Sequence, residues 1–184
     1  MKIVLASQSP QRKELLQRLG VEFEIAVPDV EEVSGGEPAE DVVENARRKA
    51  MAAQGAGGAL VIGCDTDVAI DGAALGKPAD EAAAREYLER LSGRDHEVLS
   101  GLVLRGPDTD RERSGVARSV VRFRELDGPA VQRYLRSGEW RERAGGYAIQ
   151  GLGSTLVERV EGDVSNVIGL PLGLLLELAP ELAT

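Results

Sequence analysis

The segment Ile3-Val-Leu-Ala-Ser-Gln-Ser-Pro10 joins a short apolar run to the start of a helix. Ile3–Ala6 is apolar throughout, which is typical of a buried strand. Ser9 is a favourable N-cap, Pro10 suits the first helical position, and Gly20 suits the position just beyond a helix end. We therefore predict a strand over Ile3–Ala6 and a helix from Pro10 that stops at Gly20.

The remaining sequence alternates segments of strand length with segments of helical spacing. We expect strands at Phe23–Val27, Leu60–Gly63 with its end at Asp65, Glu97–Leu104, Ser114–Phe123, Thr155–Val160 and Val164–Ile168, with a hairpin over Val68–Leu75 around Asp71-Gly72 and a turn at Gly106-Pro-Asp108. We expect helices from Pro38 to about Gln54, from an Asp80 N-cap to Leu91, over Pro129–Arg136 and after Pro171. The connector Gly55–Gly58 is too short to separate domains. This order predicts a single α/β domain over residues 1–184, with a mixed sheet flanked by helices.

The chain has 184 residues, of which 42% are hydrophobic and 29% are charged, as is usual for a globular protein. No apolar stretch approaches the roughly 18 residues that a membrane-spanning helix needs. The first residues run into the predicted strand without the basic and apolar regions of a signal peptide. We therefore expect a cytoplasmic protein with no membrane partner.

The net charge of −9 argues against nucleic acid as a partner, because phosphate backbones are bound by broad basic surfaces. The single cysteine, Cys64, excludes an internal disulfide, and the single histidine excludes metal sites built from several Cys and His ligands. Any metal would therefore be held by oxygen. That histidine, His96, has no nucleophile elbow to serve, so we interpret it as a structural hydrogen-bonding residue.

The residues after the first predicted strand are suited to binding phosphate. Ser7 and Ser9 place two hydroxyl groups at the start of a helix, and Arg12 adds a guanidinium on its first turn. Free N–H groups and the helix dipole attract anions there, and arginine binds phosphate through two parallel hydrogen bonds. The alternative, that Ser9 only caps the helix while Arg12 lies in solvent, stays open at this point.

Only four of the 22 basic residues are lysines, so a lysine in an unusual setting is informative. Lys77 lies between Gly76 and Pro78 just after the predicted hairpin, which favours a lysine directed inward at a phosphate. Lys49 follows two arginines on a predicted helix. Taken alone, this setting favours a position on a solvated helix face.

Asp65 and Asp67 flank Thr66 at the end of the apolar strand predicted from Leu60. Alternate side chains of an extended segment point the same way, so the two carboxylates would lie side by side. Ligands of open α/β proteins bind at strand ends, and carboxylates there can bind hard divalent cations or accept a proton from water. The same three residues also suit the start of a turn. Glu32 is a second source of carboxylate, although its acidic loop favours a solvated position.

Seven segments resemble, in order, the motifs of the Maf family. They are Leu5-Ala-Ser-Gln-Ser-Pro-Gln-Arg-Lys-Glu-Leu-Leu16, Glu44-Asn-Ala-Arg-Arg-Lys-Ala50, Gly63-Cys-Asp-Thr-Asp-Val68, Gly76-Lys-Pro78, Leu91-Ser-Gly-Arg-Asp-His96, Ala144-Gly-Gly-Tyr-Ala-Ile-Gln-Gly151 and Val167-Ile-Gly-Leu-Pro171. The resemblance covers essentially the whole chain. Maf proteins are nucleoside triphosphate pyrophosphatases first linked to inhibition of septum formation.

The resemblance implies a fold like that of the inosine triphosphate pyrophosphatases, with a cleft beside the sheet. It implies cleavage between the α and β phosphates of a nucleoside triphosphate, giving the monophosphate and pyrophosphate. A divalent cation, Mg or Mn, is the implied cofactor. Members of the family commonly form dimers, so we expect a homodimer.

The resemblance also implies a role for each matched residue. Asp65 matches the catalytic aspartate, which would accept a proton from the attacking water or orient it. Glu32 would hold the metal together with Asp65. The triphosphate would be bound by Ser7, Arg12, Lys49 and Lys77. For Glu32 and Lys49, this replaces the solvated interpretation with a functional one.

The motif that ends at Gly151 has the Ile-Gln-Gly form of the branch acting on dTTP and UTP. Gln150 suits that choice, because one carboxamide can donate to O4 and accept from N3–H of uracil or thymine. Thr66 matches another selectivity position. Gln11 stands where many relatives have arginine, at a position linked to substrate preference.

Two further departures from the family pattern are Asp67, where an apolar residue is common, and Arg143, where lysine is common. Two other functions remain as alternatives: a pyrophosphatase for other modified nucleotides, and a nucleotide-binding regulator of cell division without turnover.

Overall fold

The computed structural model describes residues 1–53, 58–106 and 112–183, and in this part of the chain seven strands form one mixed sheet. The sheet order is β2-β1-β3-β5-β6-β7, with β4 paired to β3. β1 runs parallel to β2 and β3, and the other pairs are antiparallel. The strands are β1 (Lys2–Ala6), β2 (Glu24–Ala26), β3 (Ala59–Ile70), β4 (Ala73–Ala74), β5 (Asp95–Arg105), β6 (Glu112–Phe123) and β7 (Val157–Glu161). The predicted mixed sheet is confirmed.

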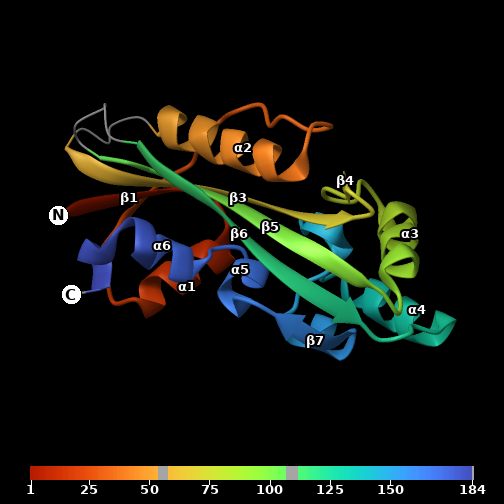
Figure 1. Cartoon of the computed structure of the whole chain (residues 1–184). Coiled ribbons are helices and arrows are strands. Elements are labelled where there is room, and N and C mark those ends of the chain that lie inside the picture. The colour runs from red at the N-terminus through yellow and green to blue at the C-terminus, as the bar shows by residue number, and fades with distance from the viewer. Residues whose placement is uncertain (54–57, 107–111, 184) are drawn as a thin grey trace.

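Helices cover both faces of this sheet (Figure 1). They are α1 (Pro10–Arg18), α2 (Pro38–Ala52), α3 (Glu81–Leu91), α4 (Gly128–Ser137), α5 (Val164–Ile168) and α6 (Leu172–Leu178), with short 3-10 helices η1 (Ala144–Gly146), η2 (Gly151–Thr155) and η3 (Pro180–Ala183). Figure 1 shows α2 along one face and α1, α5 and α6 on the other, while α3 and α4 lie at one end of the long strands. None of the described helices is long and apolar enough to cross a bilayer.

The predicted helix caps are confirmed. Ser9 Oγ accepts a hydrogen bond from Arg12 N, and Asp80 Oδ1 accepts one from Ala83 N. Helix and strand ends mostly fall within two residues of the predicted positions. Gln54, Gly55–Gly57 and the last two residues of the predicted turn at 106–108 lie outside the described residues.

The prediction that a strand ends at Asp65 is wrong, because β3 continues to Ile70. Its residues from Asp65 to Ala69 pair with β5, so backbone hydrogen bonds carry the strand through the polar segment. The predicted hairpin around Asp71-Gly72 is confirmed and joins β3 to β4. Asp65 therefore lies within a long strand, and the interpretation of Asp-Thr-Asp as the start of a turn is also wrong.

The prediction of a strand over Val164–Ile168 is wrong as well, since this segment is the helix α5. Its β-branched residues favour a strand by propensity. Asp163 instead caps a helix by accepting from Ser165 N at 2.7 Å. Asn166 is fully buried and donates to Val98 O and to Ser119 Oγ, 3.0 Å from each. These contacts with the sheet outweigh the local preference.

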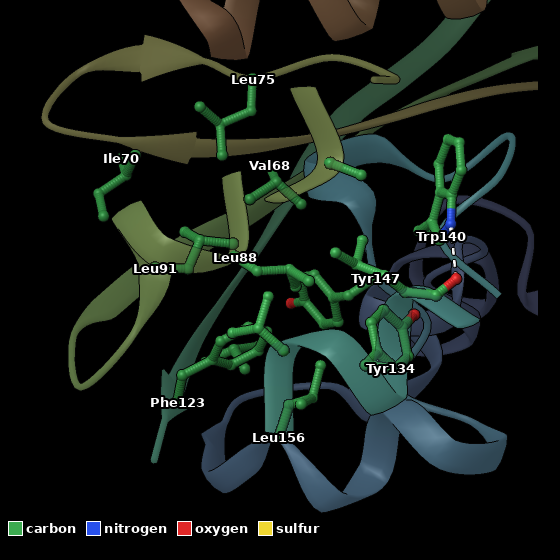
Figure 2. Close-up of a cluster of buried hydrophobic side chains, with 14 of the residues drawn as sticks. Val68, Ile70, Leu75, Leu88, Leu91, Phe123, Tyr134, Trp140, Tyr147 and Leu156 are labelled. Atoms are coloured by element: carbon green, nitrogen blue, oxygen red, sulfur yellow. Dashed lines mark hydrogen bonds between the residues drawn. The ribbon is translucent and has the colours of Figure 1, made fainter. Parts of the chain in front are cut away.

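The core at the end of the long strands holds most of the aromatic residues (Figure 2). Trp140 Nε1 donates to Leu135 O at 3.1 Å. His96 is buried beside this cluster, with Nε2 2.8 Å from Tyr147 Oη and the ring 4.9 Å from the Phe123 ring centroid. The interpretation of His96 as a structural hydrogen-bonding residue is confirmed.

Two glycines allow α2 to lie directly on the sheet next to Asp65. Gly63 precedes Asp65 by two residues on the same face of β3, and Gly101 is the direct partner of Asp65 in β5. A Cβ atom at either glycine would overlap a main-chain carbonyl oxygen of α2. Close approach brings the side chains of Asn45 and Lys49 within hydrogen-bonding distance of Asp65.

Candidate active site

Three consecutive residues of β3, Asp65, Thr66 and Asp67, are contacted by three different parts of the chain. β1 ends opposite Gly63, so β3 extends past the end of its parallel neighbour. Side chains alternate along a strand, so the two aspartates point to the α2 face and Thr66 points to the opposite face. Several of the predicted site residues therefore meet along one short segment, from both faces of the sheet.

Lys49 joins two of the predicted acidic residues on the α2 face. Its Nζ lies 2.6 Å from Asp65 Oδ1 and 2.5 Å from Glu32 Oε1. Lys49 and Asp65 are only 8% and 9% exposed. Charges removed from water in this way are as a rule paired with an opposite charge, because an unpaired buried charge is costly. The interpretation of Lys49 as part of a solvated helix face is wrong.

Asn45 connects this cluster to the acidic loop. Its side chain accepts from Val33 N at 2.7 Å and donates to Val33 O at 3.0 Å. The same Nδ2 donates to Asp65 Oδ2 at 3.1 Å. One buried amide therefore holds the residue next to Glu32 and also orients the Asp65 carboxylate.

Glu32 and Asp65 fit a divalent cation by their donor chemistry. Two carboxylates share one ammonium, which leaves the cluster with a net negative charge. Mg²⁺ is usually bound by one or two carboxylates together with substrate phosphates. Across the described ranges, no group of three or more His, Cys, Asp and Glu side chains is arranged to hold a metal ion. The protein ligands therefore suit a cation that is also held by substrate.

Arg12 lies on the opposite face of β3, fixed by three acceptors. It donates from Nε to Gly169 O at 2.8 Å, from Nη2 to Thr66 Oγ1 at 3.2 Å and from Nη1 to Ser7 Oγ at 3.4 Å. Thr66 Oγ1 also lies 2.8 Å from Ser100 Oγ. Arg12 does not lie free in solvent, so that alternative is wrong, and its guanidinium is held beside the strand residue that follows Asp65.

Asp67 contacts the backbone that leads to Lys77. Its Oδ1 accepts from Val68 N at 2.7 Å and from Gly76 N at 3.0 Å. Burial raises the pKa of Asp67 to about 6, and the negative charges of Asp65 and Glu32 also raise it, while the two backbone hydrogen bonds lower it.

The other predicted residues lie further out. Lys77 is exposed, and its Nζ lies 3.4 Å from Glu142 Oε2. Gln11 accepts from Ser9 Oγ at 3.2 Å. Gln150 is exposed immediately before η2. Within the described residues, no hydrogen bond joins Gln11, Gln150 or Lys77 to Asp65, so their part in the site rests on the family resemblance.

Two surface depressions lie elsewhere. One, of about 740 Å³, is lined by residues of β1, β2 and α1, and the other, of about 450 Å³, is lined by Val30, Arg48 and Met51 among others. Neither includes Asp65.

The model of the Maf-like protein family matches residues 2–182. The chain belongs to the Maf-like protein family. The Maf-like resemblance expected from the seven segments is therefore confirmed over nearly the whole chain.

Curated Maf-like relatives named dTTP/UTP pyrophosphatase match most of this chain. The one from Dictyoglomus thermophilum is 44% identical over 174 residues, covering 92% of this chain and 90% of the relative. Those from Symbiobacterium thermophilum and Deinococcus radiodurans are 47% and 46% identical, covering 92% and 96% of this chain and 88% and 91% of the relatives. Among solved structures, the Staphylococcus aureus Ham1 protein is similar with a TM-score of 0.48 and 18% identity, covering 67% of this chain and 72% of that chain.

Sequence reasoning assigns no role to two residues that fix the chain next to predicted site residues of this Maf-like protein. Asn45 is one, although a polar residue next to the apolar stripe of α2 indicates a buried side chain with hydrogen-bond partners. Glu139 is the other: its two carboxylate oxygens accept from Leu152 N and Gly153 N, each at 3.0 Å, and so hold η2 directly after Gln150. No local pattern indicates that contact.

Proposed function

We propose that this chain hydrolyses dTTP and UTP between the α and β phosphates, releasing the nucleoside monophosphate and pyrophosphate. The observation that carries the proposal is the meeting of acidic and cationic side chains along Asp65-Thr-Asp67. Lys49 reaches Asp65 from one face and also pairs with Glu32, and Arg12 reaches Thr66 from the other face. Membership of the Maf-like family and the name dTTP/UTP pyrophosphatase that the relatives carry support the substrate class.

Asp65 is proposed as the proton acceptor. Its two oxygens receive hydrogen bonds from Lys49 and Asn45, which fix the plane of the carboxylate. An ionised carboxylate has about four acceptor positions, so room remains for a water molecule. Asp65 would take a proton from that water while the water oxygen attacks the α phosphorus. The bond between the α phosphorus and the oxygen of the leaving pyrophosphate breaks in the same step.

Ser7, Arg12, Lys49 and Lys77 are proposed to bind the triphosphate. Charge develops on the leaving pyrophosphate during phosphoryl transfer, and fixed cations nearby lower the barrier. Arg12 is already fixed by Gly169 and Thr66 and so loses little freedom on binding. Arginine and lysine donors together would neutralise charge along the phosphate chain.

Glu32 and Asp65 are proposed to hold the divalent cation, Mg or Mn, with phosphate oxygens as further ligands. When bound, such a cation polarises the phosphoryl oxygens and lowers the pKa of water. Lys49, between the same two carboxylates, would limit their mutual repulsion before a nucleotide arrives.

Base selection is proposed to rest on Gln150, with Gln11 and Thr66 contributing. The Gln150 carboxamide can pair with both O4 and N3–H of uracil or thymine. The Thr66 hydroxyl already contacts Arg12 and Ser100, so its contribution would act through the placement of Arg12.

We further propose one domain that forms a homodimer and does not bind nucleic acid. The apolar side chains of Ile25 and Val27 at the β2 edge of the sheet are 45% and 62% exposed. Their exposure supports an interface with a second copy of the chain at this edge. The net charge of −9 opposes binding to a phosphate backbone. Light scattering of the purified chain at several concentrations tests the dimer.

The deciding experiment is hydrolysis of dTTP and UTP with Mg²⁺ in water enriched in ¹⁸O. Attack at the α phosphorus puts the label in the nucleoside monophosphate and releases unlabelled pyrophosphate. Release of orthophosphate, or label in pyrophosphate, contradicts the proposal. Asp65→Asn should abolish turnover while Asp71→Asn, an exposed aspartate on the adjacent hairpin, should not. A panel with modified nucleotides and the other nucleoside triphosphates separates the proposed substrates from the alternatives.

A further inference from the structure

We propose that Asp67 is a positioning residue, which holds Lys77 at the active site by binding the backbone of Gly76. This inference rests on the proposed function, because it assigns Lys77 to the triphosphate. Across the described residues, no hydrogen bond or ion pair joins Asp67 to the Lys49 ammonium or to Arg12. Its Oδ1 instead accepts from Val68 N at 2.7 Å and Gly76 N at 3.0 Å.

Gly76 is held from two sides. Its N–H donates to Asp67, and its carbonyl oxygen accepts from Gly145 N at 2.8 Å. Its φ of +62° is a conformation that glycine adopts without strain. Lys77 follows immediately and is followed by Pro78, whose ring limits the backbone. The position of the Lys77 backbone is therefore set by these two hydrogen bonds.

Lys77 needs such an anchor because its side chain is not held by packing. The side chain is 53% exposed, and its ion-pair partner Glu142, with Oε2 3.4 Å from Lys77 Nζ, is 86% exposed. An ion pair this exposed contributes little to fixing a side chain. The backbone of residues 76 and 77 therefore determines which positions the Lys77 ammonium can occupy.

The same contact ties the segment before Gln150 to β3. Gly145 packs so closely on Val68 that a Cβ atom there would lie 2.8 Å from the Val68 side chain. Gly145 also donates to Gly76 O. Asp67 therefore connects β3 to Gly76, the residue before Lys77. Through the carbonyl group of Gly76, the same contact extends to Gly145 in η1.

The role requires an acceptor oxygen and does not require a negative charge. This separates it from a further metal ligand, for which the charge would matter. Asp67→Ala removes the acceptor, while Asp67→Asn keeps a carbonyl oxygen in the same place. We expect Asp67→Ala to lower kcat/KM for dTTP about tenfold or more, as small displacements of a binding group do. We expect Asp67→Asn to recover most of that loss.

A double-mutant cycle with Lys77→Ala tests whether Asp67 acts through the lysine. In the Lys77→Ala background, Asp67→Ala should lower kcat/KM by less than about twofold further, because coupled residues are not additive. Asp71→Asn is the matched control on the same hairpin: Asp71 is exposed with φ +55°, a conformation that asparagine tolerates. Its kinetics should match those of the unmodified chain.

Amide hydrogen exchange of Gly76 supplies a readout that does not depend on turnover. Exchange should be faster in Asp67→Ala than in Asp67→Asn, because only the latter retains the acceptor. If Asp67→Ala does not fold, Asp67→Val keeps a side chain of similar size without an acceptor.

Three results would overturn the proposal: equal losses in Asp67→Asn and Asp67→Ala, a full Asp67→Ala effect in the Lys77→Ala background, or unchanged Gly76 exchange. A chain that hydrolyses neither dTTP nor UTP instead refutes the proposed function, and the exchange measurement still decides whether Asp67 holds Gly76.

Discussion

The Lys49 ammonium lies 2.6 Å from Asp65 Oδ1, and both side chains are nearly removed from water. The same ammonium lies 2.5 Å from Glu32 Oε1. A single cation thus balances part of the charge of two carboxylates that are proposed to hold a metal. Stability and activity are therefore expected to depend on the same residue.

Replacement of Lys49 by methionine should destabilise the fold. It leaves Asp65 buried without its cation, and breaking a buried pair by removing one partner costs about 3 to 5 kcal/mol. Urea unfolding followed by circular dichroism measures the loss. Lys13→Met is the matched control, because Lys13 is an exposed lysine on α1, and its unfolding midpoint should barely change. Equal midpoints for the two variants would contradict the buried pair.

Replacement of Asn45 by alanine should weaken metal binding more than nucleotide binding. The variant loses both hydrogen bonds to Val33 and the one to Asp65, so Glu32 and Asp65 are no longer held together. Loss of groups that orient metal ligands typically lowers affinity about 10- to 100-fold. Calorimetric titration with Mn²⁺, and activity as a function of Mg²⁺ concentration, measure the shift. An unchanged Mg²⁺ requirement would refute this role.

Alanine at Gly101 should destabilise the fold by forcing α2 away from the sheet. The added Cβ atom would overlap the Val42 carbonyl oxygen, which is main chain and cannot turn aside. Overpacking of this kind costs about 1 to 3 kcal/mol or more. Gly106→Ala is the control, since a Cβ atom there meets nothing within 4 Å. Thermal unfolding compares the two, and comparable melting temperatures would contradict the close approach.

Stability should fall at mildly acidic pH because of His96. Burial lowers the pKa of His96 from 6.5 to about 4. Between these values the unfolded chain binds a proton that the folded chain does not, so unfolding becomes easier as the pH falls. The contribution is fully present above pH 6.5 and decreases by about 3 kcal/mol as the pH falls to about 4.

Comparison with His96→Gln isolates this effect from the titration of carboxylates. Chemical unfolding at a series of pH values from 7 to 4 should show a shallower decline for the variant, since glutamine does not titrate. Parallel curves for the two chains would show that His96 protonation does not destabilise the fold.

Most of the fold follows from local sequence patterns, and the exceptions have physical causes. The helix caps at Ser9 and Asp80 depend on neighbouring residues only, so they could be predicted. The continuation of β3 through Asp65-Thr-Asp67 depends on pairing with β5, which no local pattern reveals. The helix α5 depends on the contacts of Asn166 with Val98 and Ser119, and these lie far away in the sequence.

The site divides in the same way. The motifs indicate which residues are present, so Asp65, Lys49 and Arg12 could be named in advance. Their partners are set by tertiary structure: the burial of Lys49 follows from the close approach of α2 at Gly63 and Gly101. The roles of Asn45 and Asp67 depend on backbone groups of Val33 and Gly76, which carry no residue-specific signal.

The length of β3 has a consequence for movement of the molecule. This one strand supplies buried residues to every hydrophobic cluster found among the described residues, from Leu60 near its start to Ile70 at its end. A hinge between the two ends of the sheet would have to bend β3 together with its partner β5. When a nucleotide binds, we therefore expect side chains and connecting loops to move, while the strand that carries Asp65 keeps its conformation.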